Sequence, residues 1–164
     1  KKKKSKGDTA ASPVSKENLA IAKSWLASSD EYNLLVNGTA ITAFPVYYQN
    51  DLALLLQSLR IVQAGTEVAE VKGKDLIPAH GLAMSRLLKT SVFSTEALTY
   101  EQAIAYLRKE AIVLPPSVPK GYVLVTYKEI PLGFVKNIGN RANNLYPQEW
   151  RIRSGYLPDD IRTL

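Results

Sequence analysis

The side chains best suited to recognition chemistry lie together in one irregular stretch near the C-terminal end, residues 131–153, PLGFVKNIGNRANNLYPQEWRIR. Its amides, guanidinium groups and aromatic rings can bond base edges and 2′-hydroxyls, neutralise phosphates and stack on unstacked bases. Ordinary core packing does not require this combination. The same residue types also suit a loop that holds itself in place, because asparagine side chains bond nearby backbone groups in turns.

In this second interpretation, Asn143 and Asn144 bond their own backbone. Arg141 pairs with Glu149 through charge-assisted hydrogen bonds, and two aromatic residues belong to the core, Tyr146 and Trp150. A loop that reads RNA must itself be held in place, so one residue can serve both roles. The sequence leaves both interpretations open.

Catalytic chemistry has few candidates, because the 164 residues include one histidine and no cysteine. The lack of cysteine excludes disulfides, thiolate zinc sites and cysteine nucleophiles. A Ser-His-Asp arrangement would depend on His80, and no GxGxxG, GxxxxGKS or GxxxxGKT phosphate cradle occurs. The sequence therefore predicts a chain that is not an enzyme by itself and that holds no metal.

A second group of candidates surrounds His80, in the segment IPAHGLAMSRLL. If His80 lies in the first turn of a helix, its imidazole can contact a phosphate or a base, and Lys72 and Lys74 can add charge. The alternative is a half-buried histidine that bonds a neighbouring loop, with both lysines solvated.

The net charge of +6 is concentrated at the start, where five of the first six residues are lysine. Such a run is typical of a solvated linker. In the remainder, residues 128–153 hold five basic and two acidic side chains, whereas residues 8–75 hold five basic and eight acidic ones. The asymmetry favours the C-terminal third as the surface for an anionic partner.

Four helices are expected from apolar spacing and capping signals. Ser15 is suited to an N-cap, Pro78 to a first helical position, and Thr99 with Gln102 to a capping box. The expected helices span residues 15–26, 52–59, 78–88 and 99–109.

Two hairpins are expected from alternating β-prone runs. The first joins residues 32–36 and 39–44 through Asn37-Gly38, a strong hairpin signal, and the second joins residues 122–127 and 132–138. Shorter strands are expected at residues 60–63 and 67–71. The fold class is therefore α+β.

The proline-rich segment 115–119 is typical of a linker and indicates a domain boundary. We therefore expect a basic linker at 1–14, an α+β module at 15–114 and a smaller domain at 115–164. No apolar run approaches the roughly 20 residues that cross a bilayer, and no signal peptide is recognisable. A cytoplasmic protein without membrane partners is expected. Because the chain starts at Lys1, we expect a piece of a longer polypeptide.

The segment GYVLVTYKEIPLGFVKNIGNRANNLYPQEWRIR resembles the C-terminal PUA-like RNA-binding domain of bacterial RsmF-type ribosomal RNA cytosine methyltransferases, of the Nop2/Sun/fmu family. The upstream segment AEVKGKDLIPAHGLAMSRLL resembles the first C-terminal domain of the same proteins. Here Ala79 stands where serine is usual, and Gly81 where alanine is usual. The resemblance covers about residues 32–153.

The resemblance implies a mixed helix and hairpin module followed by a small PUA-like β-barrel. It also implies a non-catalytic region that positions ribosomal RNA for a methyltransferase domain of the same polypeptide, in ribosome biogenesis. The family uses S-adenosylmethionine and two cysteines, neither of which this chain can supply, so no cofactor is expected here. The implied RNA contacts are Lys136, Asn137, Arg141, Asn143, Asn144, Tyr146 and Arg151, with Lys72, Lys74 and His80 upstream.

Within these contacts, Lys136 and Arg151 would neutralise phosphates, Tyr146 would stack, and the amides would bond base edges or 2′-hydroxyls. Two other function classes remain. One is a protein-interaction domain that docks on the catalytic domain or on a ribosomal protein, which would expose an apolar patch. The other is an independent enzyme that acts through His80.

Overall fold

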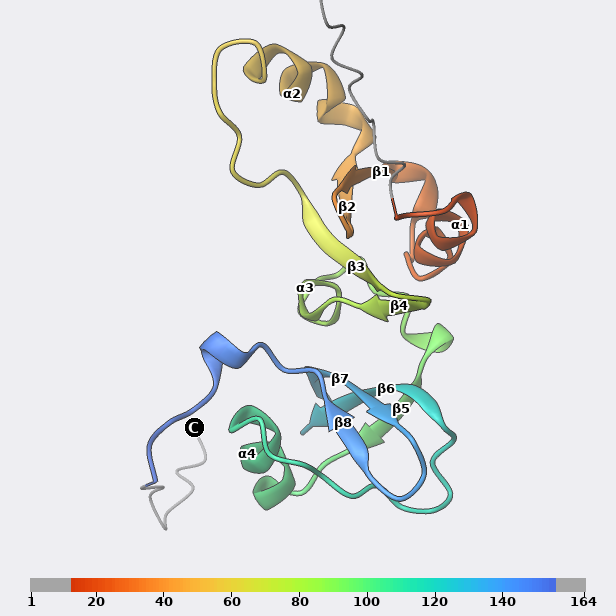
Figure 1. Ribbon diagram of the computed structural model, residues 1–164, viewed down its shortest axis with the longest axis vertical. Helices are drawn as coiled ribbons and strands as arrows, with labels where there is room; N and C mark the ends of the chain where they lie inside the picture. The colour runs from red at the N-terminus through yellow and green to blue at the C-terminus, as the bar shows by residue number, and fades with distance from the viewer. Residues whose placement is uncertain (1–12, 156–164) are drawn as a thin grey trace, which may run out of the picture. The chain divides into compact units, whose positions relative to one another are not determined.

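The computed structural model describes residues 13–155, which divide into two compact units between Leu82 and Ala83 (Figure 1). The lysine-rich start of the predicted linker lies outside the described residues. The division falls earlier than the predicted boundary at 114/115, because the segments before Pro115 pair and pack with the strands that follow it. The fold class is α+β, as predicted.

The first unit contains one antiparallel sheet in the order β1-β2-β3-β4. The strands are β1 (Tyr32–Asn37), β2 (Ala40–Pro45), β3 (Thr66–Lys72) and β4 (Asp75–Pro78). The first predicted hairpin is confirmed, although Asn37 pairs with Ala40, so the turn consists of Gly38-Thr39. Only Gly38 of the two has a positive φ, +60°, as in a type II′ turn.

The helices of this unit are α1 (Lys16–Ser24), α2 (Gln49–Leu55) and the single turn α3 (His80–Ala83), with 3₁₀ turns η1 (Ser29–Glu31) and η2 (Val46–Tyr48). Ser15 caps α1 as predicted, since its hydroxyl accepts from the Asn18 amide at 3.1 Å. Helix α2 begins earlier than expected because it continues directly from η2. In Figure 1, α1 and α2 lie beside the β1–β2 hairpin.

Two sequence predictions in this unit are wrong. Residues 60–63 form no strand, and Val62 is 93% exposed there, because no described strand pairs with this segment. The helix expected over 78–88 is reduced to α3, because Pro78 ends β4 opposite Ala69. Proline has no backbone N–H to donate to a neighbouring strand. Strand β4 is the last strand of the sheet, where a proline is tolerated.

The second unit contains a sheet in the order β5-β6-β7-β8. It consists of β5 (Ser94–Ala97), β6 (Gly121–Tyr127), β7 (Ile130–Asn137) and β8 (Ala142–Asn144). Strand β5 runs parallel to β6, and the other pairs are antiparallel. The β6–β7 hairpin was predicted, and its turn residues Lys128 and Glu129 both have positive φ, as a type I′ turn requires. Sequence reasoning missed β5 and β8.

Helix α4 (Tyr100–Leu107) covers one face of this sheet, with 3₁₀ turns η3 (Thr90–Val92) and η4 (Gln148–Trp150) elsewhere in the unit. The predicted capping box is present: Gln102 N–H donates to the Thr99 hydroxyl at 3.3 Å, and Thr99 N–H to the Gln102 side chain at 3.0 Å. The core between helix and sheet is built from aliphatic side chains of β6 and β7 around one tyrosine: Tyr106, Val123, Val125 and Val135. No helix within residues 13–155 is long and apolar enough to cross a membrane.

Candidate nucleic-acid interface

Three side chains from neighbouring strands of the second unit form a row on one face of the sheet. Tyr122 of β6 pairs with Lys136 of β7, which pairs in turn with Asn143 of β8. Partners directly across a sheet point to the same face. We call Tyr122, Lys136 and Asn143 the surface row.

The surface row combines a ring, a cation and an amide. The Lys136 ammonium lies 5.6 Å from the centre of the Tyr122 ring, within cation–π range. Tyr122 and Lys136 are half-buried and Asn143 is exposed. Sequence reasoning missed Tyr122, although alternation along 122–127 places it on the face opposite Val123.

Two further cations lie at the turn that joins β7 to β8. The turn is closed by a hydrogen bond from the Ile138 amide to the Arg141 carbonyl, 3.0 Å, and Gly139 has φ +105°. The Lys120 side chain runs over Gly139, so closely that a Cβ there would lie 2.9 Å from Lys120 Cε. Lys120 and Arg141 are exposed, and Lys120 was not predicted as a contact.

Asn137, a predicted contact, is 5% exposed and bonds within the protein. Its amide nitrogen donates to the Val118 carbonyl at 3.0 Å and to the Pro119 carbonyl at 3.1 Å. Its carbonyl oxygen accepts from the Gly139 amide at 3.0 Å. Asn137 therefore fixes the segment before β6 against the turn that follows β7.

Asn144 also bonds within the protein, at the end of α4. Its side-chain nitrogen donates to the carbonyls of Tyr106 and Glu110, at 2.8 and 2.9 Å, and its oxygen accepts from the Tyr146 amide at 2.9 Å. The Tyr146 ring meets the Tyr106 ring edge-on, with centroids 5.4 Å apart. The Tyr106 hydroxyl donates to the Phe134 carbonyl at 3.2 Å, and burial raises the pKa of Tyr106 well above its ordinary range.

Helix α4 ends in a Schellman motif. The amides of Lys109 and Glu110 donate to the carbonyls of Tyr106 and Ala105, both at 2.9 Å. Lys109 takes the left-handed conformation, φ +66°, and its ammonium donates to the Tyr146 carbonyl. Burial lowers the pKa of Lys109, and the nearby Glu149 opposes that shift.

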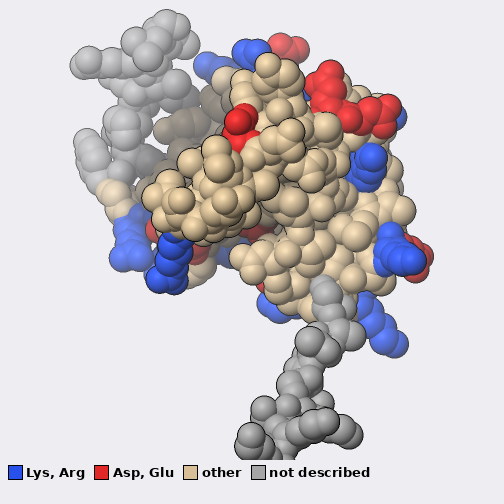
Figure 2. Space-filling view, turned by 90° about the horizontal axis from the view of Figure 1, so that it is seen from above, with Lys and Arg blue, Asp and Glu red and all other residues tan. Residues whose placement is uncertain are grey.

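The proposed internal pairing of Arg141 with Glu149 is absent from the described part of the chain, where Arg141 makes no ion pair. Trp150 is 60% exposed, so it is not a core residue. Arg151 is exposed and lies with two other arginines in a hollow near the end of α4. Figure 2 shows Lys and Arg side chains scattered over the surface that it views, with wide uncharged areas between them.

The upstream candidates belong to the first unit. Lys72 ends β3 and Lys74 lies in the turn to β4, and both are exposed. His80 begins α3 and is half-buried, and burial lowers its pKa. Because α3 is a single turn, it offers no aligned helix N-terminus to an anion. Within residues 13–155 no cluster of three or more His, Cys, Asp or Glu could hold a metal ion.

The second unit, with its sheet β5-β6-β7-β8 and its covering helix, is a PUA-like domain. Residues 93–152 match the family model of the methyltransferase RsmF PUA domain. The predicted resemblance is confirmed. The match begins at Phe93, so β5 and α4 belong to this domain.

Similar curated proteins are named ribosomal RNA small subunit methyltransferase F. The protein from Enterobacter sp. (strain 638) is 28% identical over 138 residues, 84% of this chain and 27% of the relative. The protein from Shigella boydii serotype 4 is 30% identical over 114 residues, which are 70% of this chain and 22% of the relative. The protein from Shewanella piezotolerans is 28% identical over 120 residues, which are 73% of this chain and 24% of the relative. The chain thus spans about a quarter of the length of these relatives.

Proposed function

We propose that this chain is a non-catalytic RNA-binding region that positions ribosomal RNA for a methyltransferase domain of the same polypeptide. The observation that carries the proposal is the surface row, which lies in the domain that matches the RsmF PUA family. Methyl transfer is what the relatives' names state. S-adenosylmethionine and the reacting cysteines would belong to a domain beyond these 164 residues, which contain no cysteine.

Each group of the interface has a chemical role in this proposal. The Tyr122 ring stacks on an unpaired base, the Lys136 ammonium and the Arg141 guanidinium neutralise phosphates, and the Asn143 amide bonds a base edge or a 2′-hydroxyl. Lys120, which lies over the turn, adds a further positive charge. Tyr122, Lys136 and Asn143 come from strands whose positions are fixed by backbone hydrogen bonds, so little order is lost when they bind.

Three of the other predicted contacts support the interface from behind. Asn137, Asn144 and Tyr146 hold the turn after β7 and the segment after β8 through internal hydrogen bonds. We propose that they position the surface row instead of meeting RNA themselves. Lys72, Lys74 and His80 lie in the other unit, and a contact from them would be a second, separate one.

Salt-dependent binding to a structured fragment of ribosomal RNA tests the proposal. For Lys136→Ala with Arg141→Ala, the log–log slope of affinity against salt should fall by about 1.4–1.8, which is 0.7–0.9 per lost phosphate contact. Fluorescence anisotropy of labelled RNA at several salt concentrations measures this slope. The matched control is Arg86→Ala with Lys89→Ala, which removes two exposed cations of the same unit outside the interface.

An unchanged slope in the Lys136 and Arg141 double variant would remove the surface row from the interface. A slope that falls equally in the control would show that binding depends only on total charge.

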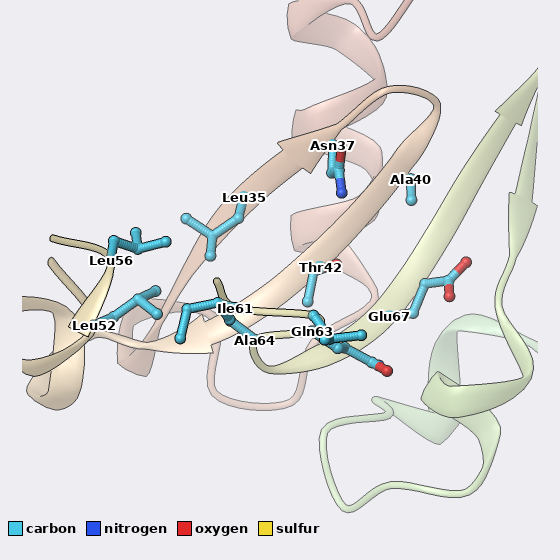
Figure 3. Close-up of a pocket in the computed structure, with 11 residues that line it drawn as sticks. Leu35, Asn37, Ala40, Thr42, Leu52, Leu56, Ile61, Gln63, Ala64 and Glu67 are labelled. Carbon is cyan, nitrogen blue, oxygen red and sulfur yellow. The ribbon is translucent and has the colours of Figure 1, made fainter. Parts of the chain in front are cut away.

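A second candidate function, docking on a methyltransferase domain, is favoured by the apolar surface of the first unit. A pocket of about 370 Å³ opens between β1, β2 and α2, and Figure 3 shows Leu35, Leu52 and Leu56 gathered on one side of it. In α2 and the segment that follows it, Leu54 is 64% exposed and Leu59 57% exposed. An exposed apolar surface of this kind marks protein contacts more often than RNA contacts.

The docking function predicts that Leu54→Ser with Leu59→Ser weakens association with a separately produced methyltransferase domain of a relative, measured by calorimetry, while RNA affinity is unchanged. Equal association of the wild-type chain and the variant with the methyltransferase domain would reject this candidate function. Concentration-dependent dimerisation that the substitutions abolish would assign the surface to a second copy of the chain.

A further inference from the structure

Three arginines surround a hollow in the second unit that the surface row does not include. The hollow has a volume of about 360 Å³ and is lined by side chains from the end of α4 and from the segment after η4. We call it the arginine pocket, and its charged members are Arg108, Arg151, Arg153 and Glu110.

The C-terminal segment is held against α4 by two hydrogen bonds. The Ile152 amide donates to the Leu107 carbonyl, and Arg108 Nη2 donates to the Ser154 carbonyl, both at 2.9 Å. Arg151 is extended, with φ −57° and ψ 141°. Arg151 and Arg153 both line the hollow.

The charge of the arginine pocket is positive, and Arg151 and Arg153 are its exposed cations, since Arg108 is half-buried and donates to the Ser154 carbonyl. Three guanidinium groups face one carboxylate, that of Glu110. Among residues 13–155, Arg151 and Arg153 make no ion pair, and both are exposed. Guanidinium groups present planar forks of N–H donors that match phosphate oxygens, and they stay charged at any physiological pH.

The position of the arginine pocket relates it to the surface row through β8. Asn143 and Asn144 are neighbours on this strand, so their side chains point to opposite faces. Asn143 belongs to the surface row, whereas Asn144 donates to the carbonyl of Glu110, a residue that lines the pocket. The two groups therefore flank the strand that ends the sheet.

We infer that the arginine pocket binds a phosphate group of the RNA backbone, as a second contact of the same RNA on the other side of β8 from the surface row. The inference rests on the proposed function and deepens it. An RNA strand that crosses the short strand β8 would meet Lys136 and Asn143 on one side and the guanidinium groups on the other. Phosphate contacts of this kind fix orientation and register without reading sequence.

The test uses the full chain and the same labelled RNA. In Arg151→Ala with Arg153→Ala, the salt slope should fall by about 1.4, twice the 0.7 expected per single-strand contact, and affinity should fall about tenfold. Both side chains are exposed, so folding should be retained. Glu110→Gln should act in the opposite direction and tighten binding, and Arg86→Ala with Lys89→Ala is the matched control.

The outcomes separate this inference from the proposed function. If the wild-type chain binds no structured RNA, both fail. If the Lys136 and Arg141 variant loses affinity while the Arg151 and Arg153 variant binds like the wild type, only the arginine pocket is overturned. A titration with inorganic phosphate, followed by the NMR signals of arginine Nε, provides the second arm. Saturation by free phosphate with no effect of the arginine substitutions on RNA binding would assign the pocket to a free anion and overturn the RNA contact.

Discussion

At the scale of single residues, the pair Asn143-Asn144 shows how one sequence motif divides between two roles. The two side chains are chemically identical and adjacent, but a strand directs them to opposite faces. Asn143 is exposed in the surface row, whereas Asn144 makes three hydrogen bonds to the backbone. The amide-rich composition of the motif could be read from the sequence. Which amide serves the fold could not, because that depends on where α4 lies.

The first prediction compares these two residues. Asn144→Ala should lower the free energy of unfolding by about 1–3 kcal/mol, because it removes the side-chain donor to the Glu110 carbonyl, one of the donors to the Tyr106 carbonyl and the acceptor of the Tyr146 amide. Asn143→Ala should change it by less than about 0.5 kcal/mol, as exposed sites do, while weakening RNA binding. Urea denaturation followed by circular dichroism measures both. Equal destabilisation by the two substitutions would contradict the assignment.

The second prediction concerns His80, whose pKa is lowered from 6.5 by burial. Burial favours the neutral imidazole, so the unfolded chain binds the proton more readily than the folded one. The resulting stability is present in full above pH 6.5 and is lost as the pH falls from there through the lowered pKa. Between pH 7.5 and pH 5, wild type should therefore lose more stability than His80→Gln. Parallel pH profiles of the two proteins in thermal denaturation would refute it.

At the scale of elements, strong local signals gave correct predictions and weak ones did not. The capping box of α4, the N-cap of α1 and both long hairpins follow from residues close in sequence. Strands β5 and β8 are only four and three residues long. Their sequences carry no clear alternation, and they exist because β6 and β7 offer pairing edges. The helix expected at 78–88 failed because tertiary pairing of β4 outweighed the helical signals.

The third prediction concerns the end of α4, where Lys109 adopts a left-handed conformation that favours glycine. Lys109→Ala keeps the backbone strain and loses the hydrogen bond to the Tyr146 carbonyl, so it should destabilise the protein by about 1–2 kcal/mol. Lys109→Gly loses the same bond but relieves the strain, and should be more stable than the alanine variant by about 1 kcal/mol. Thermal melting ranks the three proteins. An alanine variant at least as stable as the glycine variant would contradict the Schellman geometry.

At the scale of the whole molecule, two units carry two kinds of surface. The first exposes apolar side chains around α2, and the second presents cations and amides along β6, β7 and β8. The sequence predicted both the charge asymmetry and the family of the second unit. It did not predict that residues 83–114 belong to that unit, because the prolines at 115–119 mimic a linker while β5 pairs across them.

The most direct measurement is NMR mapping of the full chain during titration with structured ribosomal RNA. The account predicts shifts at Lys120, Tyr122, Lys136, Arg141 and Asn143, with the arginine Nε signals of the arginine pocket changing in the same titration. Signals of α2 should remain in place. Shifts confined to the first unit, or none at saturating RNA, would contradict the claim that the exposed cations and amides of the PUA-like domain bind RNA.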